Sequence, residues 1–254
     1  MTGQRRITII SKADVFLRML FPPRCVLCDE LLSVPEQEEG IHDGCREKLP
    51  ILREPLCMQC GRPVAFPEEE FCYDCTIKRR RESYVPVIRQ GKALYGYHGR
   101  MKQAMYRLKY ANRREYASFF AREAYRMWGA WMKRCGIEGI TAVPMYEGKR
   151  KKRGYNQAEL IARSLAKIMG LPYLDGVVIR IRDTRAQKEL DNRERKNNLK
   201  NAFQKQKNIV QYTCVLLVDD IYTTGNTVEA VAEELYRAGI KEIYTLAVCI
   251  GEGI

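Results

Sequence analysis

The chain has 254 residues, 46% of them hydrophobic, so it can bury a sizeable core and is not expected to be disordered. No apolar run reaches the roughly 20 residues that span a bilayer, and Lys12, Asp14 and Arg18 interrupt any signal-peptide core. We therefore expect a cytoplasmic protein without a membrane span. Its net charge of +13 favours polyanionic partners, namely nucleic acid, anionic lipid or phosphorylated metabolites, or simply keeps the protein soluble.

Seven of the ten cysteines lie between residues 25 and 75, and a histidine completes a series of four two-ligand knuckles. The candidate metal ligands are Cys25, Cys28, His42, Cys45, Cys57, Cys60, Cys72 and Cys75. A CxxC pair places two thiolates on one side of a tetrahedron, so the four knuckles predict two structural zinc ions. Disulfides, a redox dithiol and an iron–sulfur cluster are alternatives that fit the spacing less well. His42 is the weakest ligand, and an exposed His42 would leave the first site incomplete.

We predict two domains from this segregation of cysteines. A zinc-ribbon module with a short N-terminal helix is expected over residues 1–80, and a larger domain over residues 84–254. The basic run KRRR (78–81) is interpreted as a solvated linker, with contact to a phosphate backbone as the alternative.

The larger domain alternates helical and strand patterns. Apolar residues at helical spacing predict helices over residues 101–108, 116–131, 158–169 and 228–239. Short apolar runs predict strands over residues 140–143, 177–181, 214–218 and 243–250. Alternating strands and helices with continuously apolar central strands predict an α/β fold with a parallel twisted sheet.

The stretch VLLVDDIYTTGNTVEAV (215–231) carries the strongest chemical signal. In parallel sheets, ligands bind beyond the carboxyl ends of the strands, where Asp219 and Asp220 are expected. A polar turn leads from them into a helix, whose free N–H groups and positive dipole end attract phosphate. The turn consists of Thr223, Thr224, Gly225, Asn226 and Thr227. Two acids that accept hydrogen bonds from vicinal hydroxyls, beside a phosphate cradle, predict a ribose 5-phosphate site. Rival interpretations are a Walker loop, which would need a lysine, a receiver-type aspartate and a merely polar turn.

The same stretch resembles the motif by which type I phosphoribosyltransferases bind 5-phosphoribosyl pyrophosphate (PRPP). This resemblance implies that Asp219 and Asp220 bind the ribose hydroxyls and serve catalysis, that residues 223–227 hold the 5′-phosphate, and that Mg²⁺ accompanies PRPP. It also implies the sheet arrangement of that transferase class.

Two further stretches, RGYNQAELIA (153–162) and TRAQKELDNRERKNNLKNAF (184–203), resemble signature segments of the ComF family, as does LKY (108–110). ComF proteins combine a zinc-ribbon module with a phosphoribosyltransferase domain and are associated with DNA uptake during natural competence. His42 stands where the family pattern has a cysteine.

Basic segments supply further candidate contacts to phosphate or DNA. The resemblance places the turn after residue 143 at the pyrophosphate, and that turn continues into the basic run of Lys149, Arg150, Lys151, Lys152 and Arg153. It also places residues 184–203, with Arg185 and Arg195, in a loop that closes over the reaction centre. The alternatives are a solvated basic loop over 149–153 and an exposed amphipathic helix over 184–203. Interleaved Tyr and Arg residues over 105–116 suggest stacking on bases, although most of that stripe is expected to be core.

Three functions remain in competition. The resemblance implies a competence-type protein that handles incoming single-stranded DNA and binds PRPP. The alternatives are an active phosphoribosyltransferase with an unknown acceptor, and an adaptor that docks a competence helicase or recombination-loader protein.

Overall fold

The computed structural model describes residues 21–82, 84–183 and 201–251, and the chain divides into two compact units between Leu49 and Pro50. The expected N-terminal helix and the candidate contacts Arg185 and Arg195 lie outside the described residues. None of the helices in the described ranges is long and apolar enough to cross a membrane.

The smaller unit has little regular structure. Its described part contains the 3-10 helix η1 (Val34–Glu36) and the short helix α2 (Asp43–Arg46). Within residues 21–49, the buried apolar side chains other than cysteine are Val26, Leu27, Leu32, Ile41 and Leu49. Metal bound by the cysteines among them would add to the stability of this part of the unit.

The larger unit is built on a four-stranded sheet in the order β1-β6-β5-β2. Its strands are β1 (Ile88–Gly96), β2 (Gly139–Ala142), β5 (Cys214–Tyr222) and β6 (Glu242–Ile250). Every pair of neighbours is parallel, which confirms the predicted α/β class. The sequence analysis missed β1, because Arg89, Gln90 and Lys92 interrupt its apolar pattern at the edge of the sheet.

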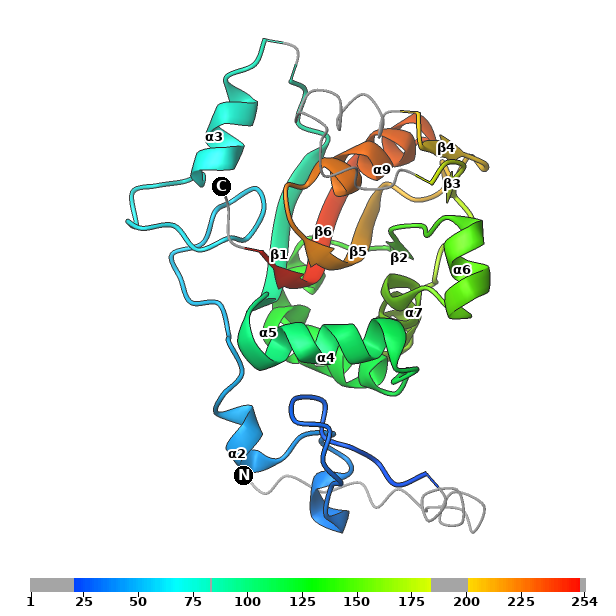
Figure 1. Ribbon diagram of the computed structural model, residues 1–254. Helices are drawn as coiled ribbons and strands as arrows, with labels where there is room; N and C mark the ends of the chain where they lie inside the picture. Colours follow the sequence, from blue (N-terminus) through cyan, green and yellow to red (C-terminus); the bar gives the residue numbers. More distant parts are fainter. Residues whose placement is uncertain (1–20, 83, 184–200, 252–254) are drawn as a thin grey trace. The chain divides into compact units, whose positions relative to one another are not determined.

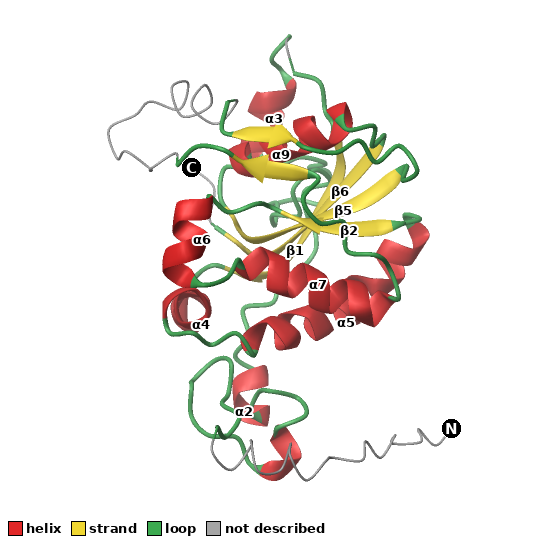
Figure 2. Cartoon of the chain, turned by 90° about the vertical axis from the view of Figure 1, so that its right-hand side faces the viewer, coloured by secondary structure: helices red, strands yellow, loops and turns green. Residues whose placement is uncertain are grey.

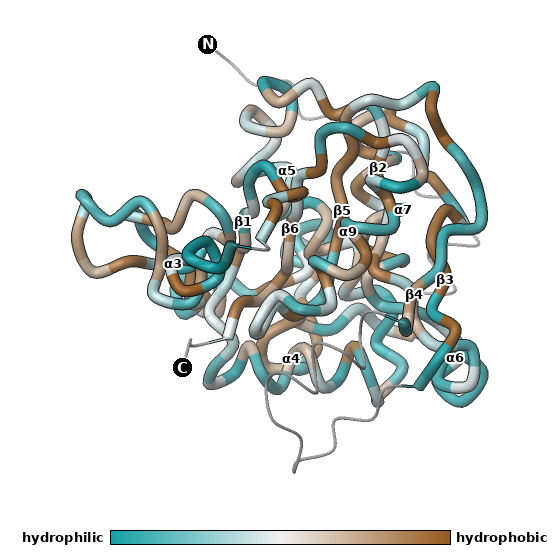
Figure 3. The backbone as a smooth tube through the Cα atoms, turned by 90° about the horizontal axis from the view of Figure 1, so that it is seen from above, coloured by the Kyte–Doolittle hydropathy of each residue, from teal (hydrophilic) through white to brown (hydrophobic). Residues whose placement is uncertain are grey.

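Helices cover both faces of this sheet (Figures 1 and 2). The described residues of the larger unit form the helices α3 (Tyr73–Arg79), α4 (Gly99–Tyr110), α5 (Tyr116–Arg134), α6 (Glu147–Arg153), α7 (Gln157–Met169) and α9 (Asn226–Arg237). Helices α4, α5 and α7 lie on one side of the sheet and α9 on the other (Figure 2). Figure 3 shows apolar colouring along β5 and hydrophilic colouring along α6.

Two predicted elements differ from the structure. The strand predicted over 177–181 exists as β3 (Val178–Arg180), but it pairs antiparallel with β4 (Phe203–Lys205) in a separate two-stranded sheet. The basic run 149–153 belongs to helix α6 rather than to a loop, and Gly154 ends that helix with a φ of 85°. Lys and Arg are good helix formers, so a run of them is compatible with a short helix.

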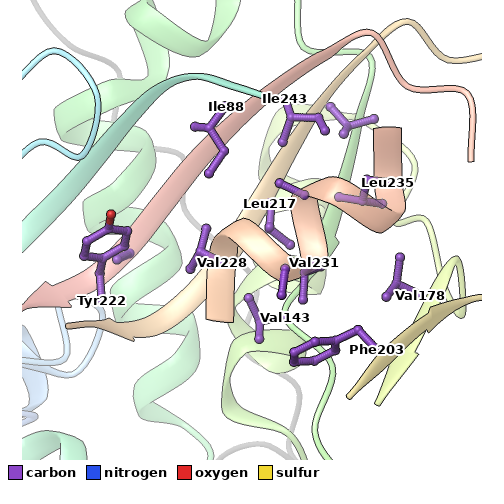
Figure 4. Close-up of a cluster of buried hydrophobic side chains, with 14 of the residues drawn as sticks. Ile88, Val143, Val178, Phe203, Leu217, Tyr222, Val228, Val231, Leu235 and Ile243 are labelled. Carbon is purple, nitrogen blue, oxygen red and sulfur yellow. The ribbon is translucent and has the colours of Figure 1, made fainter. Parts of the chain in front are cut away.

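The core on the α9 side of the sheet extends into the second cysteine cluster. Val228, Val231 and Leu235 of α9 face Leu217 and Ile243 of the sheet (Figure 4). The same continuous buried cluster includes all four cysteines between residues 57 and 75. The second cluster is therefore part of the larger unit, whereas the composition of the sequence had put a domain boundary between residues 80 and 84.

Candidate functional site

The acid pair lies near the carboxyl end of β5, one of the two central strands. The strand runs on to Tyr222, so Asp219 and Asp220 are within it rather than beyond it. Oδ1 of Asp219 accepts a hydrogen bond of 2.8 Å from the backbone N–H of Asp220. Oδ2 of Asp220 lies 2.9 Å from Nζ of Lys109, in the last turn of α4. Both carboxylates are half-buried, so a ligand at this edge meets one carboxylate already paired with a cation.

Electrostatics separates the two acids. Burial, and then the charge of Asp220, raises the pKa of Asp219 to about 7. Burial alone would lower the pKa of Lys109, but the charge and hydrogen bond of Asp220 raise it above the ordinary value, so this lysine stays charged. Asp219 thus titrates near neutrality beside a fixed ion pair, an arrangement often found at functional sites.

Lys109 is a site residue that the sequence analysis did not assign. Lys109 entered the sequence analysis only as the middle residue of the segment LKY (108–110), which resembles the ComF family. Its role depends on a contact between α4 and β5, and no local pattern reports such a contact.

The turn after β5 has the geometry of an anion cradle. Gly225 precedes α9 with a φ of 79°, and a Cβ at this position would collide with the Tyr222 hydroxyl. Because glycine has no side chain, it leaves the first N–H groups of α9 without a cap from that position. The five residues predicted for phosphate, 223–227, therefore lie where backbone amides and the helix dipole favour an anion.

The turn after β2 is fixed by one residue of the family-like segment RGYNQ. The Asn156 side chain donates a 2.9 Å hydrogen bond to the Val143 carbonyl and accepts a 3.1 Å bond from the Ala158 N–H. It caps α7 and ties that helix to the residue directly after β2. Asn156 therefore fixes the turn after β2, and β2 is the neighbour of β5, the strand that carries the acid pair.

The basic residues of α6 do not act as one group. Lys149 lies 2.5 Å from Asp183, and Arg150 lies 3.1 Å from Glu159, so both are already in ion pairs. Lys151 and Lys152 are exposed. Arg153 donates to Gln157 and lies 4.8 Å above the Tyr110 ring.

An open groove of about 580 Å³ brings α6 together with the end of α4. Its lining consists of cations, tyrosines and one asparagine: Lys109, Tyr110, Asn112, Arg114, Lys149, Lys152, Arg153 and Tyr155. Tyr110 is 63% exposed. The two segments that the sequence analysis singled out separately, 105–116 and 149–153, therefore share one basic, aromatic surface.

The four predicted ligands of the smaller unit form one cluster, with all ligand atoms within 4.8 Å of one another. In His42, Nδ1 lies 3.4 Å from Cys28 Sγ and Nε2 lies 3.0 Å from the Leu31 carbonyl oxygen. A carbonyl only accepts hydrogen bonds, so Nε2 carries the proton and Nδ1 turns its lone pair toward the thiols. This donor set of one nitrogen and three sulfurs fits tetrahedral zinc.

The four predicted ligands of the larger unit form a second cluster of the same size, with every cysteine buried. The sulfurs of Cys60 and Cys72 are 3.6 Å apart. A tetrahedral site with Zn–S bonds of about 2.3 Å separates its sulfurs by about 3.8 Å. The second cluster therefore fits a closed structural zinc site, with no position left for catalysis.

Comparison with known families finds two matching domains. Residues 16–76, which extend across the division between Leu49 and Pro50 and contain both cysteine clusters, match the model of the double zinc ribbon domain. Residues 151–252 match that of the phosphoribosyl transferase domain. Among solved structures, the glutamine PRPP amidotransferase from Bacillus subtilis, complexed with ADP and GMP, aligns at 19% identity and a TM-score of 0.34. The alignment covers 53% of this chain and 25% of that one, so this chain spans about a quarter of that enzyme.

Several curated proteins are similar over most of the chain. DNA utilization protein YhgH of Salmonella typhimurium is 30% identical over 90% of this chain and 97% of its own length. Competence protein F of Haemophilus influenzae is 29% identical over 87% and 93%, and competence protein ComFC of Bacillus subtilis is 25% identical over 85% and 89%. With a double zinc ribbon followed by a phosphoribosyltransferase domain, and near full-length similarity to these proteins, the chain belongs to the ComF family.

Proposed function

We propose that the larger unit binds PRPP, or a closely related sugar phosphate, at the carboxyl end of β5. The observation that carries this proposal is the adjacency of the acid pair to the turn before α9. Carboxylates of Asp219 and Asp220 accept hydrogen bonds from the two ribose hydroxyls. The N–H groups of residues 223–227 donate to the 5′-phosphate, which the positive end of α9 also attracts.

The carboxylate-rich edge also suits the cation that accompanies PRPP. Mg²⁺ prefers oxygen ligands, and when bound with the ligand it neutralises phosphate charge. Asp219 and Asp220 are the residues that would hold it here, and Lys109 keeps the Asp220 carboxylate in place.

Calorimetric titration of PRPP with Mg²⁺ tests the proposal. The parent protein should bind, and Asp219→Asn/Asp220→Asn should not. The double variant Glu68→Gln/Glu70→Gln removes two exposed acids and is the matched control for net charge. Equal binding by the parent and the acid-pair variant would refute a ribose site at β5.

A second function, the handling of single-stranded DNA in natural transformation, is favoured by the groove between α4 and α6. The groove combines cations with exposed Tyr110, and stacking on aromatic rings beside cations is how sequence-independent single-strand binders work. The names of the relatives, competence protein and DNA utilization protein, support the same function. Clusters that need reduced thiolates support a cytoplasmic location. Helicases and recombination loaders are the partners that such a role implies.

Fluorescence anisotropy with labelled single-stranded DNA tests this second function. Affinity should fall steeply with salt, and Lys152→Ala/Arg153→Ala should flatten the salt dependence. Tyr110→Ala should weaken binding, whereas Tyr236→Ala removes another exposed tyrosine, 56% exposed against 63%, and should not. Binding unaffected by any of these changes would place the DNA elsewhere on this chain.

Turnover is the alternative role of the same sugar-phosphate site. In a transfer, the acceptor would form a bond to the anomeric carbon, lose a proton, and displace pyrophosphate. A hollow of about 260 Å³ between β2 and β3, lined in part by Asn156, Tyr173 and Arg180, has room for a small acceptor. Acceptor-dependent release of pyrophosphate, abolished in Asp220→Asn, would establish an enzyme.

A further inference from the structure

The second cysteine cluster is bonded to the proposed phosphate turn from both of its halves. Arg62 follows the Cys57–Cys60 knuckle, and its Nη2 donates a 2.9 Å hydrogen bond to the Thr223 carbonyl. Lys78 is on α3, the helix that contains Cys75, and its Nζ donates a 2.5 Å bond to the Thr224 carbonyl. We call residues 57–79, which contain the second cluster and α3, the ribbon. Two consecutive peptide groups of the turn are thus held by two cations of the ribbon.

These cations are held firmly. Arg62 is only 9% exposed, and its Nη1 forms a 2.5 Å ion pair with Asp74 in the other knuckle. Lys78 forms a 2.7 Å ion pair with Glu229 in the first turn of α9. Charge-assisted hydrogen bonds shielded from water are among the stronger polar contacts in proteins. The ribbon therefore fixes the turn rather than merely touching it.

The knuckle itself is seated on the sheet. Gly61 has a φ of 76°, and a Cβ there would lie 2.9 Å from the Gly91 carbonyl oxygen and from Cα of Lys92 in β1. The cysteines share a buried cluster with Tyr222 and Val228, which flank the turn on either side. A displacement of the knuckle is therefore transmitted to the turn.

The carbonyl contacts determine where the amides of the turn point. In a planar trans peptide, the C=O and the following N–H lie on opposite sides. Tying the carbonyls of Thr223 and Thr224 to the ribbon therefore directs the N–H groups of Thr224 and Gly225 away from it. These are N–H groups that the 5′-phosphate requires, and a turn already set in this orientation binds with less loss of entropy.

We propose that Arg62 and Lys78 are positioning residues of the sugar-phosphate site, and that metal at the second cluster pre-organises the turn through them. The proposal rests on the proposed function, because it assumes that this turn takes the phosphate. According to this proposal, the ribbon increases the affinity for the sugar phosphate in addition to stabilising the fold. A ribbon with only a structural role would stabilise the fold without setting the turn.

Amide hydrogen exchange of the ligand-free protein tests the orientation directly. Lys78→Met and Arg62→Met should each exchange the amides of residues 224 and 225 about tenfold faster, since each loses one charge-assisted bond. Lys78→Arg should stay close to the parent. Arg80→Met removes an exposed cation one residue beyond α3 and is the matched control. Exchange in Lys78→Met and Arg62→Met equal to that of Arg80→Met would overturn the proposal.

Ligand affinity provides the second readout. PRPP with Mg²⁺ should bind about tenfold more weakly to Lys78→Met, with recovery in Lys78→Arg. Unchanged affinity together with a lower melting temperature of the variants would make Arg62 and Lys78 structural residues only and refute the proposal. If the parent itself does not bind PRPP, the proposed function fails, and the exchange rates still decide whether the ribbon sets the turn.

Separate loss of the two metals completes the test. Cys75→Ser, which impairs the second cluster, should raise exchange at residues 224 and 225 as Lys78→Met does. His42→Ala, which impairs the first cluster, should leave the exchange of those amides at the parent rate while one zinc per chain is lost. Equal exchange in Cys75→Ser and His42→Ala would refute a special role for the second cluster.

Discussion

The ammonium of Lys109 lies 2.9 Å from the carboxylate of Asp220 and also lines the groove between α4 and α6. A single side chain thus borders both the proposed ribose site and the proposed DNA surface. The charge of Asp220 raises the pKa of Lys109, and the ammonium of Lys109 in turn balances the negative charge of Asp220.

Replacing Lys109 with methionine should weaken PRPP binding and destabilise the protein. Loss of the cation leaves the half-buried Asp220 carboxylate without its ion pair, next to the acid Asp219, and the free energy of unfolding should fall by about 2 kcal/mol at pH 8. Denaturant unfolding and calorimetry measure the two effects. Lys102→Met, an exposed site on the same helix, is the control, and an equally small change in both variants would contradict the ion pair's importance.

Asp219→Asn should stabilise the protein at pH 8 while abolishing PRPP binding. The folded pKa of about 7 is above the ordinary value of 3.8, so folded Asp219 keeps a proton that the unfolded chain releases. Its contribution to stability is full below pH 3.8 and is lost as pH rises through 7. Removing the carboxyl should therefore add about 1–3 kcal/mol at pH 8 and much less at pH 4.

Urea unfolding of the parent and of Asp219→Asn at both pH values checks this prediction. Glu68→Gln, which changes an exposed acid, controls for the loss of one charge. A difference between the parent and Asp219→Asn that does not depend on pH would show that burial does not perturb this acid.

Gly225→Ala should impair the proposed phosphate turn. The new Cβ would meet the Tyr222 hydroxyl, and a φ of 79° is strained for alanine, so stability should fall by about 1–2 kcal/mol and PRPP affinity with it. Gly170→Ala has a similar φ of 68° but open space around it. It should show the backbone strain without the loss of ligand, as measured by thermal unfolding and calorimetry.

His42→Ala should lower the zinc content from two ions per chain to one, and His42→Cys should keep two. The reason is that Nδ1 of His42 completes the first donor set, where a thiolate can take its place. Metal analysis by mass spectrometry measures the outcome. His98→Ala changes the only other histidine in the sequence and should keep both ions.

The order of strand, turn and helix over residues 219–227 was predictable because its signal is local. Acids near a strand end, a glycine-containing turn and a helix start lie within nine residues, and each has a preferred position in a parallel sheet. That these residues bind a sugar phosphate stays a prediction. The ligand sets were predictable for the same reason, since knuckle spacing encodes tetrahedral geometry.

The features that escaped prediction depend on distant contacts. Lys109 belongs to the site only because α4 packs against the end of β5, and the second cluster joins the larger unit only through contacts such as Arg62 to Thr223. The polar residues of β1 concealed an edge strand, and the charge of α6 suggested a loop although it forms a helix. Local patterns report neither tertiary partners nor strand order.

The strand order β1-β6-β5-β2 has a consequence for the synthesis of the chain. Strand β6 (Glu242–Ile250) is the last to leave the ribosome, yet it lies between β1 and β5. Until it emerges, β1 and β5 have exposed hydrogen-bonding edges and no common neighbour, and such edges invite aggregation. The sheet therefore closes late, and a nascent chain stopped before residue 242 would carry the second cysteine cluster and the proposed phosphate turn on an incomplete sheet.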